Sequence, residues 1–248
     1  MTDNPKTLIV IATYNEIENL PRLTEEILRY APGVHILVVD DNSPDGTGQW
    51  CDQRTATSDG FHVIHREGKL GLGSATVTGL QLAIDRGYDQ ALVMDADFSH
   101  HPRYLPDLLT RMQDHGDRKV DVVIGSRYVP GGGVEGWSLR RRIMSRCINW
   151  YARLLLGLET RDCSGAYRCY RTDILRKVDF GKIRSRGYSF LEEFLWRLKL
   201  QGARFDETPI IFVDRQEGQS KINLREAFAA LWILLSLGMR NWTGRRDA

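Results

Sequence analysis

The sequence contains few cysteines, and none of them lies in a pattern of familiar chemistry. Cys51, Cys147, Cys163 and Cys169 show neither a CxxC spacing nor a paired histidine motif. This excludes the usual zinc patterns and a disulfide framework, and it favours reduced thiols in a cytoplasmic setting. The excess of one charge sign is also small, since the formal net charge is +2. A nucleic-acid partner held by bulk electrostatics is therefore not expected.

Long hydrophobic runs are absent as well. The longest uncharged apolar stretch, residues 227–239, is thirteen residues long. As a helix it would span about 20 Å, against about 30 Å of hydrocarbon in a bilayer. The amino terminus runs straight into a predicted strand, which is not the pattern of a signal peptide. We therefore expect a chain that does not cross a membrane by itself and has no signal peptide.

The first half of the sequence alternates regularly between strand and helix patterns. Short apolar runs typical of buried strands are separated by stretches of helical spacing, such as Leu20, Leu23 and Ile27. This order predicts an α/β fold with a Rossmann-like, mostly parallel central sheet and helices on both faces. The predicted strands are residues 8–11, 36–39, 61–64, 91–94, 120–124 and 206–215, and the later predicted helices are 73–87, 102–115, 137–156 and 224–242.

Polar residues gather where several of these strands end. Since parallel strands end at the same edge of a sheet, and open α/β sheets bind ligands at that edge, the clusters predict one composite site. The clusters are Thr13-Tyr14-Asn15-Glu16, Asp40-Asp41-Asn42-Ser43, Asp95-Ala96-Asp97 and Gly125-Ser126-Arg127.

The most informative of these clusters is Asp95-Ala96-Asp97. Two carboxylates one residue apart suit a hard divalent cation, which takes oxygen ligands and usually also phosphate oxygens of a substrate. The pair therefore predicts a metal bridge to a nucleotide diphosphate. The alternative is a solvated acidic turn before the helix at Pro102, in which Asp97 or Ser99 only caps the chain.

Two further positions are predicted to bind the nucleotide. Asp41, and less clearly Asp40, could accept hydrogen bonds from a ribose or a base, although the turn-forming residues that follow offer a structural alternative. Arg127 could neutralise a diphosphate, or form an ion pair with one of the nearby acids. The glycines at 68, 71 and 73 lack the Walker spacing, so close loop packing is favoured over a phosphate-binding loop.

The late polar loop carries two more basic residues. Arg215 and Lys221 could contact phosphate when the loop folds over a substrate, or the loop could simply be solvated before the last helix.

Six motifs in this order resemble the family 2 glycosyltransferases of GT-A fold, and within them the dolichol-phosphate (polyprenol-phosphate) mannosyltransferases. The resemblance covers residues 7–222. The motifs begin at residues 12, 40, 95, 125, 162 and 213, and read ATYNE, DDNSPDGT, DADFSHHP, GSRY, DCSGAYR and VDRQEGQSK.

The resemblance implies a role for each matching position. Arg127, Arg215 and Lys221 would address the diphosphate and the lipid phosphate, and Arg141 would grip the acceptor phosphate. Asp97 and Ser99 would hold Mg²⁺ or Mn²⁺. Asp97, Arg127, Arg215 and Lys221 would thus form the catalytic set, and the donor would contact Ala12, Tyr14, Glu16, Val39, Asp41, Asp95, Ala96 and Asp97. Two departures are Ala12 in place of the usual proline and Leu191 in place of a frequent glutamine, which leaves contacts of Glu192 and Glu193 open.

The implied reaction is inverting transfer of mannose from GDP-mannose to a polyprenyl monophosphate. The acceptor oxygen is already anionic near neutral pH, so no general base is nominated, and positioning and charge stabilisation carry catalysis. Residues 1–222 would form the catalytic domain. Residues 223–248 would form an amphipathic helix and tail, with the enzyme peripheral on the cytoplasmic face of a membrane or recruited by a small membrane-spanning partner.

Three alternatives remain open at this point. A UDP-glucose donor would keep the reaction and change the sugar. A sugar-1-phosphate nucleotidylyltransferase would need a basic glycine-rich loop after the first strand, where this chain has Thr13-Tyr14-Asn15-Glu16. A non-catalytic nucleotide-sugar sensor would have no need of both metal ligands and an acceptor clamp.

Overall fold

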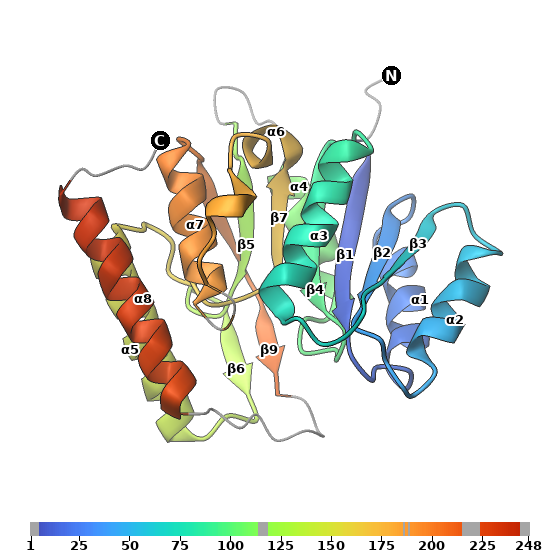
Figure 1. Cartoon of the computed structure of the whole chain (residues 1–248), viewed down its shortest axis with the longest axis horizontal. Coiled ribbons are helices and arrows are strands. Elements are labelled where there is room, and N and C mark those ends of the chain that lie inside the picture. The colour runs from blue at the N-terminus through green and yellow to red at the C-terminus, as the bar shows by residue number, and fades with distance from the viewer. Residues whose placement is uncertain (1–4, 114–118, 186, 188, 215–223, 244–248) are drawn as a thin grey trace.

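The structure is a computed structural model that describes residues 5–113, 119–185, 187, 189–214 and 224–243. Its centre is a seven-stranded sheet of order β3-β2-β1-β4-β7-β5-β8 (Figure 1). All neighbouring strands pair in parallel except those that flank β7, which is antiparallel to both β4 and β5. The strands are β1 (Thr7–Thr13), β2 (His35–Asp40), β3 (Phe61–His65), β4 (Gln90–Asp95), β5 (Val122–Ser126), β7 (Arg168–Arg171) and β8 (Phe205–Pro209).

Helices cover both faces of this sheet, because its central strands are apolar on both sides. In β1, Leu8 and Val10 belong to one core cluster, whereas Ile9 and Ile11 belong to the other. The second cluster packs under α1 (Leu20–Tyr30), α2 (Thr47–Thr55) and α4 (Leu105–Arg111). The first cluster packs under α3 (Leu72–Asp85), α5 (Leu139–Leu156), α6 (Thr172–Leu175), α7 (Phe190–Leu200) and α8 (Leu224–Thr243).

Helices α5 and α8 lie side by side at the end of the molecule farthest from β3 (Figure 1). Leu234 and Leu237 of α8 are buried, and a side chain at Gly238 would meet Leu155 of α5 at 2.9 Å. The predicted amphipathic C-terminal helix is therefore present, and its inner side joins the core. None of the helices in the described ranges combines the length and the apolar character that crossing a bilayer requires.

Several elements differ from the sequence-based expectation. The single late strand is divided into β8 and β9 (Ile211–Val213), and β9 pairs with β6 (Gly133–Glu135) in a separate two-stranded sheet. The predicted helix at 102–115 starts as a short 3₁₀ turn, η1 (Pro102–Tyr104), because Pro106 has no N–H to give to the carbonyl of Pro102. A second 3₁₀ turn, η2 (Phe180–Lys182), precedes α7.

Candidate active site

The carboxyl ends of β1, β2 and β4 meet at one edge of the sheet, as the register of the three strands requires. Each is followed within a few residues by a non-glycine residue of positive φ: Asn15 (61°), Asn42 (57°) and Phe98 (59°). This backbone conformation is uncommon outside glycine, and such strain concentrates at functional sites. Three chain reversals thus come together at the predicted composite site.

Asp40 forms a set of hydrogen bonds that holds this edge of the sheet together. Its buried carboxylate accepts hydrogen bonds from the Thr13 hydroxyl at 2.9 Å, the Ser43 amide at 3.0 Å and the Ser43 hydroxyl at 2.6 Å. Ser43 Oγ in turn accepts the amide of Asn15 at 3.0 Å. These bonds give Asp40 a structural role, and its contact with a nucleoside stays a prediction.

Asp41 forms a buried ion pair with Arg66, a residue that the sequence did not single out. Arg66 Nε donates to Asp41 Oδ1 at 2.5 Å, and both side chains are 7% exposed. Arg66 follows β3, whose residue His65 pairs in register with Asp40 of β2. The pairing of β2 with β3 would have brought Arg66 next to Asp41, so strand order was the missing signal. The contact of Asp41 with a nucleoside stays a prediction.

The other predicted nucleoside contacts lie around this pair. Tyr14 is exposed, with the Lys69 ammonium 4.4 Å from its ring centroid. The Glu16 amide donates to Thr47 Oγ1 at 3.0 Å. Ala12 and Val39 are paired in register between β1 and β2, and Val39 is fully buried. Their roles as donor contacts stay predictions.

The two acids of the Asp-x-Asp motif emerge from β4 in different surroundings. Asp97 Oδ1 accepts hydrogen bonds from the Ser99 amide at 3.1 Å and the Ser99 hydroxyl at 2.5 Å. The side chain of Asp95 is 29% exposed. Its amide donates at 3.2 Å to Nδ1 of His100, a ring that stacks on Tyr167. Burial lowers the pKa of His100, although the nearby carboxylates of Asp95 and Asp97 act to raise it.

The Asp-x-Asp motif offers a divalent cation part of the ligand set that such an ion requires. Within the described ranges, no group of three or more His, Cys, Asp or Glu side chains is arranged as a complete metal site. Two neighbouring carboxylates suit a cation that draws its remaining ligands from substrate phosphates and water, as Mg²⁺ commonly does. Asp95 and Asp97 fit that case. Ser99 orients Asp97 here, and its role as a direct ligand stays a prediction.

Arg127 forms a bidentate ion pair with Asp162, not with the acids of the Asp-x-Asp motif. Arg127 Nε and Nη2 donate to the two Asp162 oxygens at 2.7 Å each, and the Arg127 amide donates at 3.0 Å. Asp162 is fully buried, which raises its pKa, but the Arg127 charge and hydrogen bonds outweigh burial and hold the pKa below its ordinary value. The sequence-based alternative of an ion pair was thus right in kind, with a different acid.

A buried asparagine ties this pair to helix α5. Arg127 Nη2 also donates to Ser164 Oγ at 2.8 Å, and Asn149 Nδ2 donates to the same oxygen at 3.0 Å. Asn149 Oδ1 accepts the amide of Cys163 at 2.6 Å. The loop that supplies Asp162 is therefore fixed against α5 on one side.

Arg141, near the start of α5, lies at the same end of the molecule. Arg141 Nη1 donates to Asp214 Oδ2 at 2.6 Å, and the side chains are 33% and 26% exposed. Asp214 is the last described residue before the late loop. Arg215 and Lys221 lie outside the described residues, so their predicted phosphate contacts remain predictions.

Glu192, at the start of α7, is a further ionisable group near the Arg127–Asp162 pair. Its side chain is buried, its Oε2 has no hydrogen-bond partner among the described residues, and burial raises its pKa to about 7 despite the attraction of Arg168. The next residue, Glu193, is also buried but accepts hydrogen bonds from Ser185 and Arg197. Although burial opposes it, these bonds lower the pKa of Glu193.

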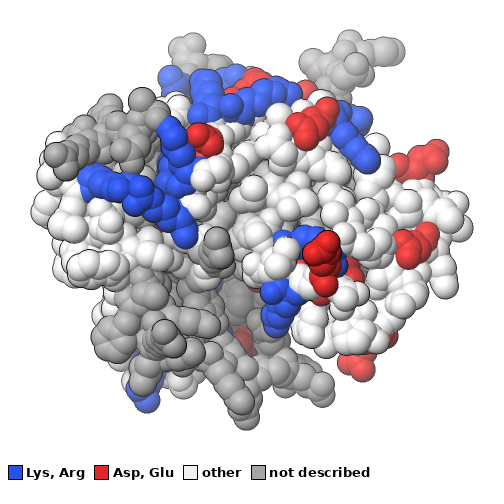
Figure 2. All heavy atoms as spheres, viewed as in Figure 1, with Lys and Arg blue, Asp and Glu red and all other residues white. Residues whose placement is uncertain are grey.

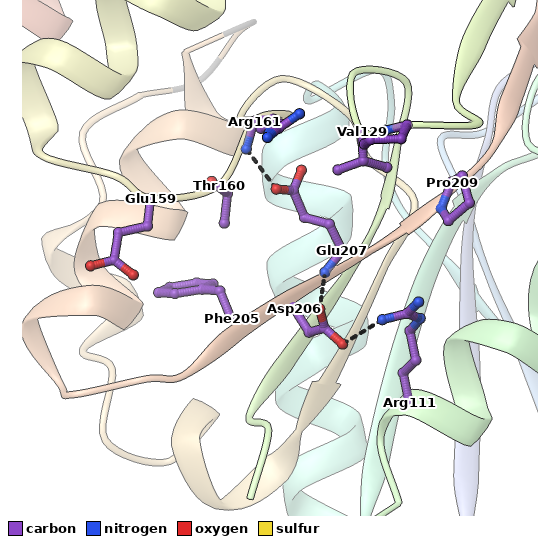
Figure 3. A pocket seen from close by; sticks show the side chains of 10 residues that line it. Arg111, Val129, Glu159, Thr160, Arg161, Phe205, Asp206, Glu207 and Pro209 are labelled. Carbon is purple, nitrogen blue, oxygen red and sulfur yellow. Dashed lines mark hydrogen bonds and ion pairs between the residues drawn. The ribbon is translucent and has the colours of Figure 1, made fainter. Parts of the chain in front are cut away.

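An open cleft of about 380 Å³ lies against the edge strand β8, where Arg161 and Glu207 help to line it (Figure 3). Glu207 reaches from β8 to residues 161 and 162, where it accepts their amides at 2.7 and 3.0 Å. Asp206 pairs with Arg111 at 2.8 Å and also caps the Glu207 amide at 2.8 Å. The cleft contains none of the predicted site residues; Glu207 instead supports the segment that carries Asp162.

Fold and site together define a class of protein. A mostly parallel sheet, with an Asp-x-Asp motif at its carboxyl edge and a buried arginine beside it, is the arrangement of a GT-A glycosyltransferase. Residues 8–179 match the family described as "Glycosyl transferase family 2". The chain therefore belongs to glycosyltransferase family 2, which confirms the resemblance, the fold class and the class of enzyme inferred from the sequence.

Two characterised relatives are similar over nearly the whole chain. The polyprenol monophosphomannose synthase of Mycolicibacterium smegmatis is 45% identical over 226 residues, which cover 90% of this chain and 84% of the relative. The undecaprenyl-phosphate mannosyltransferase of Micrococcus luteus is 44% identical over 218 residues, which cover 88% of each.

Two solved structures share the fold at low sequence identity. Glucosyl-3-phosphoglycerate synthase of Mycobacterium tuberculosis, in complex with Mn²⁺, UDP and phosphoglyceric acid, has a TM-score of 0.64 at 18% identity, over 96% of this chain and 78% of the other. Mannosyltransferase PcManGT of Pyrobaculum calidifontis, in complex with GDP-Man and Mn²⁺, has a TM-score of 0.62 at 13% identity, over 96% and 65%. These likenesses concern the fold alone.

Proposed function

We propose that this enzyme transfers mannose from GDP-mannose to a polyprenyl monophosphate, with inversion at the anomeric carbon. The observation that carries the proposal is the arrangement of Asp95 and Asp97 at the same end of the fold as the Arg127–Asp162 pair and Arg141. The 45% identity to a polyprenol monophosphomannose synthase supports the acceptor and the sugar. Family membership argues against a nucleotidylyltransferase, and the intact acids and arginines argue against a mere sensor.

On the donor side, Asp95 and Asp97 would hold Mg²⁺ or Mn²⁺. The ion, once bound, would act as a Lewis acid on the leaving diphosphate. Ser99 keeps Asp97 oriented through its hydroxyl and amide, so the carboxylate needs little reorganisation when the donor arrives. Arg127, held on both oxygens of Asp162, would present a fixed positive charge beside the diphosphate.

On the acceptor side, Arg141 would bind the lipid phosphate. A phosphate monoester oxygen attacks the anomeric carbon, a bond forms between the two, and the bond from that carbon to the GDP oxygen breaks. The nucleophile is already anionic near pH 7, since the second pKa of such a phosphate is about 6. No side chain has to remove a proton, and the enzyme's contribution is in-line positioning.

The lipid acceptor requires a route to a membrane, and we propose that α5 and α8 supply it. Their outer sides expose large apolar side chains, among them Trp150 at 64%, Trp232 at 68% and Trp242 at 67%. Arg140, Arg142 and Arg146 are exposed on α5. A paired apolar and basic surface of this kind suits an anionic lipid interface. Elsewhere, in the view of Figure 2, basic side chains gather mainly along the edge where the parallel strands begin.

The test is a radiolabel transfer assay with purified protein and a short polyprenyl phosphate in detergent. We expect label from GDP-mannose to enter the lipid phase, and to do so only when Mg²⁺ or Mn²⁺ is present. Removal of the metal by a chelator, or the change Asp97→Ala, should abolish transfer, whereas the control Asp107→Ala on α4 should not. Label from UDP-glucose alone would overturn the donor assignment.

Two further results would bear on the membrane. Transfer that requires vesicles, and fails for protein with Trp150→Ser and Trp232→Ser, would support the peripheral location. Transfer that requires a co-expressed membrane protein would instead indicate a small membrane-spanning partner.

A further inference from the structure

The indole ring of Trp137 is in contact with both of the arginines assigned to the proposed phosphate sites. The centroid of its ring is 5.4 Å from Cζ of Arg127 and 4.3 Å from Cζ of Arg141. Phe212 of β9 packs edge-on against the same ring, with centroids 5.4 Å apart and an interplanar angle of 62°. Trp137 connects β6 to α5 and is 9% exposed, so this position is well enclosed.

The polar atom of this ring has no partner in the part of the chain that the structure describes. Trp137 Nε1 is buried and finds no hydrogen-bond acceptor among the residues that the structure describes. An indole N–H can only donate, and a buried tryptophan or tyrosine usually satisfies its polar atom. The two neighbouring guanidinium groups can only donate as well. The carboxylates nearest to them, Asp162 and Asp214, already accept from these arginines.

Another tryptophan of the same chain shows the usual arrangement. Trp196 on α7 is 4% exposed, and its Nε1 donates to Asn241 Oδ1 of α8 at 3.2 Å. The unpaired N–H at Trp137 is therefore not general to the buried tryptophans of this fold. A buried donor without an acceptor costs free energy, which a ligand oxygen would recover.

We propose that Trp137 Nε1–H donates a hydrogen bond to a phosphate oxygen of a substrate, between Arg127 and Arg141. The inference rests on the proposed function and deepens it, because it adds a neutral donor between the arginine of the donor side and that of the acceptor side. The oxygen can come from the lipid monophosphate or from the nucleotide diphosphate. In either case Trp137 fixes where the phosphate lies along the line that joins the two substrates.

The first test reads the N–H directly by ¹H–¹⁵N spectra of the indole groups. Trp137→Phe and Trp196→Phe assign the two resonances. Isoprenyl monophosphate, GDP with Mg²⁺, and inorganic phosphate are then titrated separately. We expect the Trp137 resonance to move downfield with one of the two substrate analogues, which identifies the source of the oxygen, while the Trp196 resonance stays in place. No movement with either analogue at saturation, or movement with inorganic phosphate only, overturns the proposal.

The second test is kinetic and uses the same pair of variants. Trp137→Phe keeps an aromatic ring at this position and removes the N–H donor together with the second ring of the indole. Trp196→Phe makes the same change in size away from the proposed phosphate site. We expect KM to rise about tenfold for the substrate identified by the spectra, with the KM of the other substrate unchanged. Kinetics of Trp137→Phe that match those of Trp196→Phe would refute the assignment. An inactive wild type that still shows the spectral shift would refute the proposed reaction and leave the phosphate contact intact.

Discussion

The pH dependence of stability in a Glu192→Gln variant offers a direct test of the buried charges beside Asp162. Burial raises the pKa of Glu192 from 4.5 to about 7. Between these two values the folded protein keeps a proton that the unfolded chain has lost. The contribution of Glu192 to stability therefore falls as pH rises from 4.5 to 7, and stays low above that range. At about 1.4 kcal/mol for each tenfold change in proton affinity, the ionised carboxylate costs about 3 kcal/mol at pH 8.

Glutamine has nearly the same shape and cannot ionise, so it removes this cost. We expect Glu192→Gln to match the wild type near pH 4.5 and to be more stable by about 3 kcal/mol at pH 8. Urea denaturation followed by tryptophan fluorescence at several pH values measures the difference. The subtraction of wild type from variant cancels the titration of all other groups that the substitution does not perturb.

The adjacent residue provides a control of opposite sign. The pKa of Glu193 is lowered, although burial acts against this, because Ser185 and Arg197 donate to the charged form. Its stabilising effect is present above pH 4.5 and is lost as pH falls. Glu193→Gln should therefore be less stable than the wild type at pH 8. A Glu192→Gln difference that does not change with pH, or that has the sign of Glu193→Gln, would refute the reasoning.

Two further outcomes can be measured by the same denaturation assay, and a third by titration of the protein with GDP. Asp162→Asn should destabilise by about 3–5 kcal/mol, since it leaves Arg127 buried without a counter-charge, whereas Asp173→Asn at an exposed pair should cost less than about 1 kcal/mol. Gly79→Ala should cost about 1–3 kcal/mol, because the new Cβ would lie 2.2 Å from Val10 Cγ1, and the open position of Gly68 provides the control. Arg66→Ala should leave the Asp41 carboxylate without its counter-charge and should weaken nucleotide binding. A nucleotide affinity equal to that of the wild type would contradict a donor site at Asp41.

The fold was predictable where a strand or helix has a hydrophobic pattern of its own, and less so where contacts with neighbouring elements determine the structure. The strands β1, β2, β4 and β5 are short apolar runs buried on both faces, whereas the edge strand β3 is only partly buried, and the sequence indicated each of the five. The sequence did not predict strand β7, because Arg168 and Arg171 interrupt its apolar pattern. The buried guanidinium of Arg168 is satisfied by donating hydrogen bonds to the carbonyls of Leu191 and Cys163. Helix α7 was not predicted for a related reason, since the charged residues Glu192 and Glu193 lie among its buried residues and interrupt the apolar pattern.

The position of the candidate residues at one edge of the sheet was predictable, whereas their ion-pair partners were not. Asp41, Asp97 and Arg127 follow strands that the sequence identifies, so their gathering at one edge could be expected. Their partners could not. Arg66 depends on β3 lying beside β2, and Asp162 depends on an antiparallel strand between β4 and β5. Arg66 and Asp162 lie on segments that are distant in sequence from their partners, and only the complete strand order shows that these segments are adjacent.

These pairs also suggest how the two halves of the site differ. Arg127 and Asp162 have side chains 6% and 0% exposed, so exchange of this carboxylate for a phosphate would uncover a buried charge at high cost. Arg141 and Asp214 are 33% and 26% exposed, and a pair of that kind contributes little stability. A phosphate can therefore replace Asp214 at Arg141 far more easily than it can replace Asp162 at Arg127. Under the proposed function, the donor side is built before substrate arrives, whereas the acceptor side exchanges one anion for another.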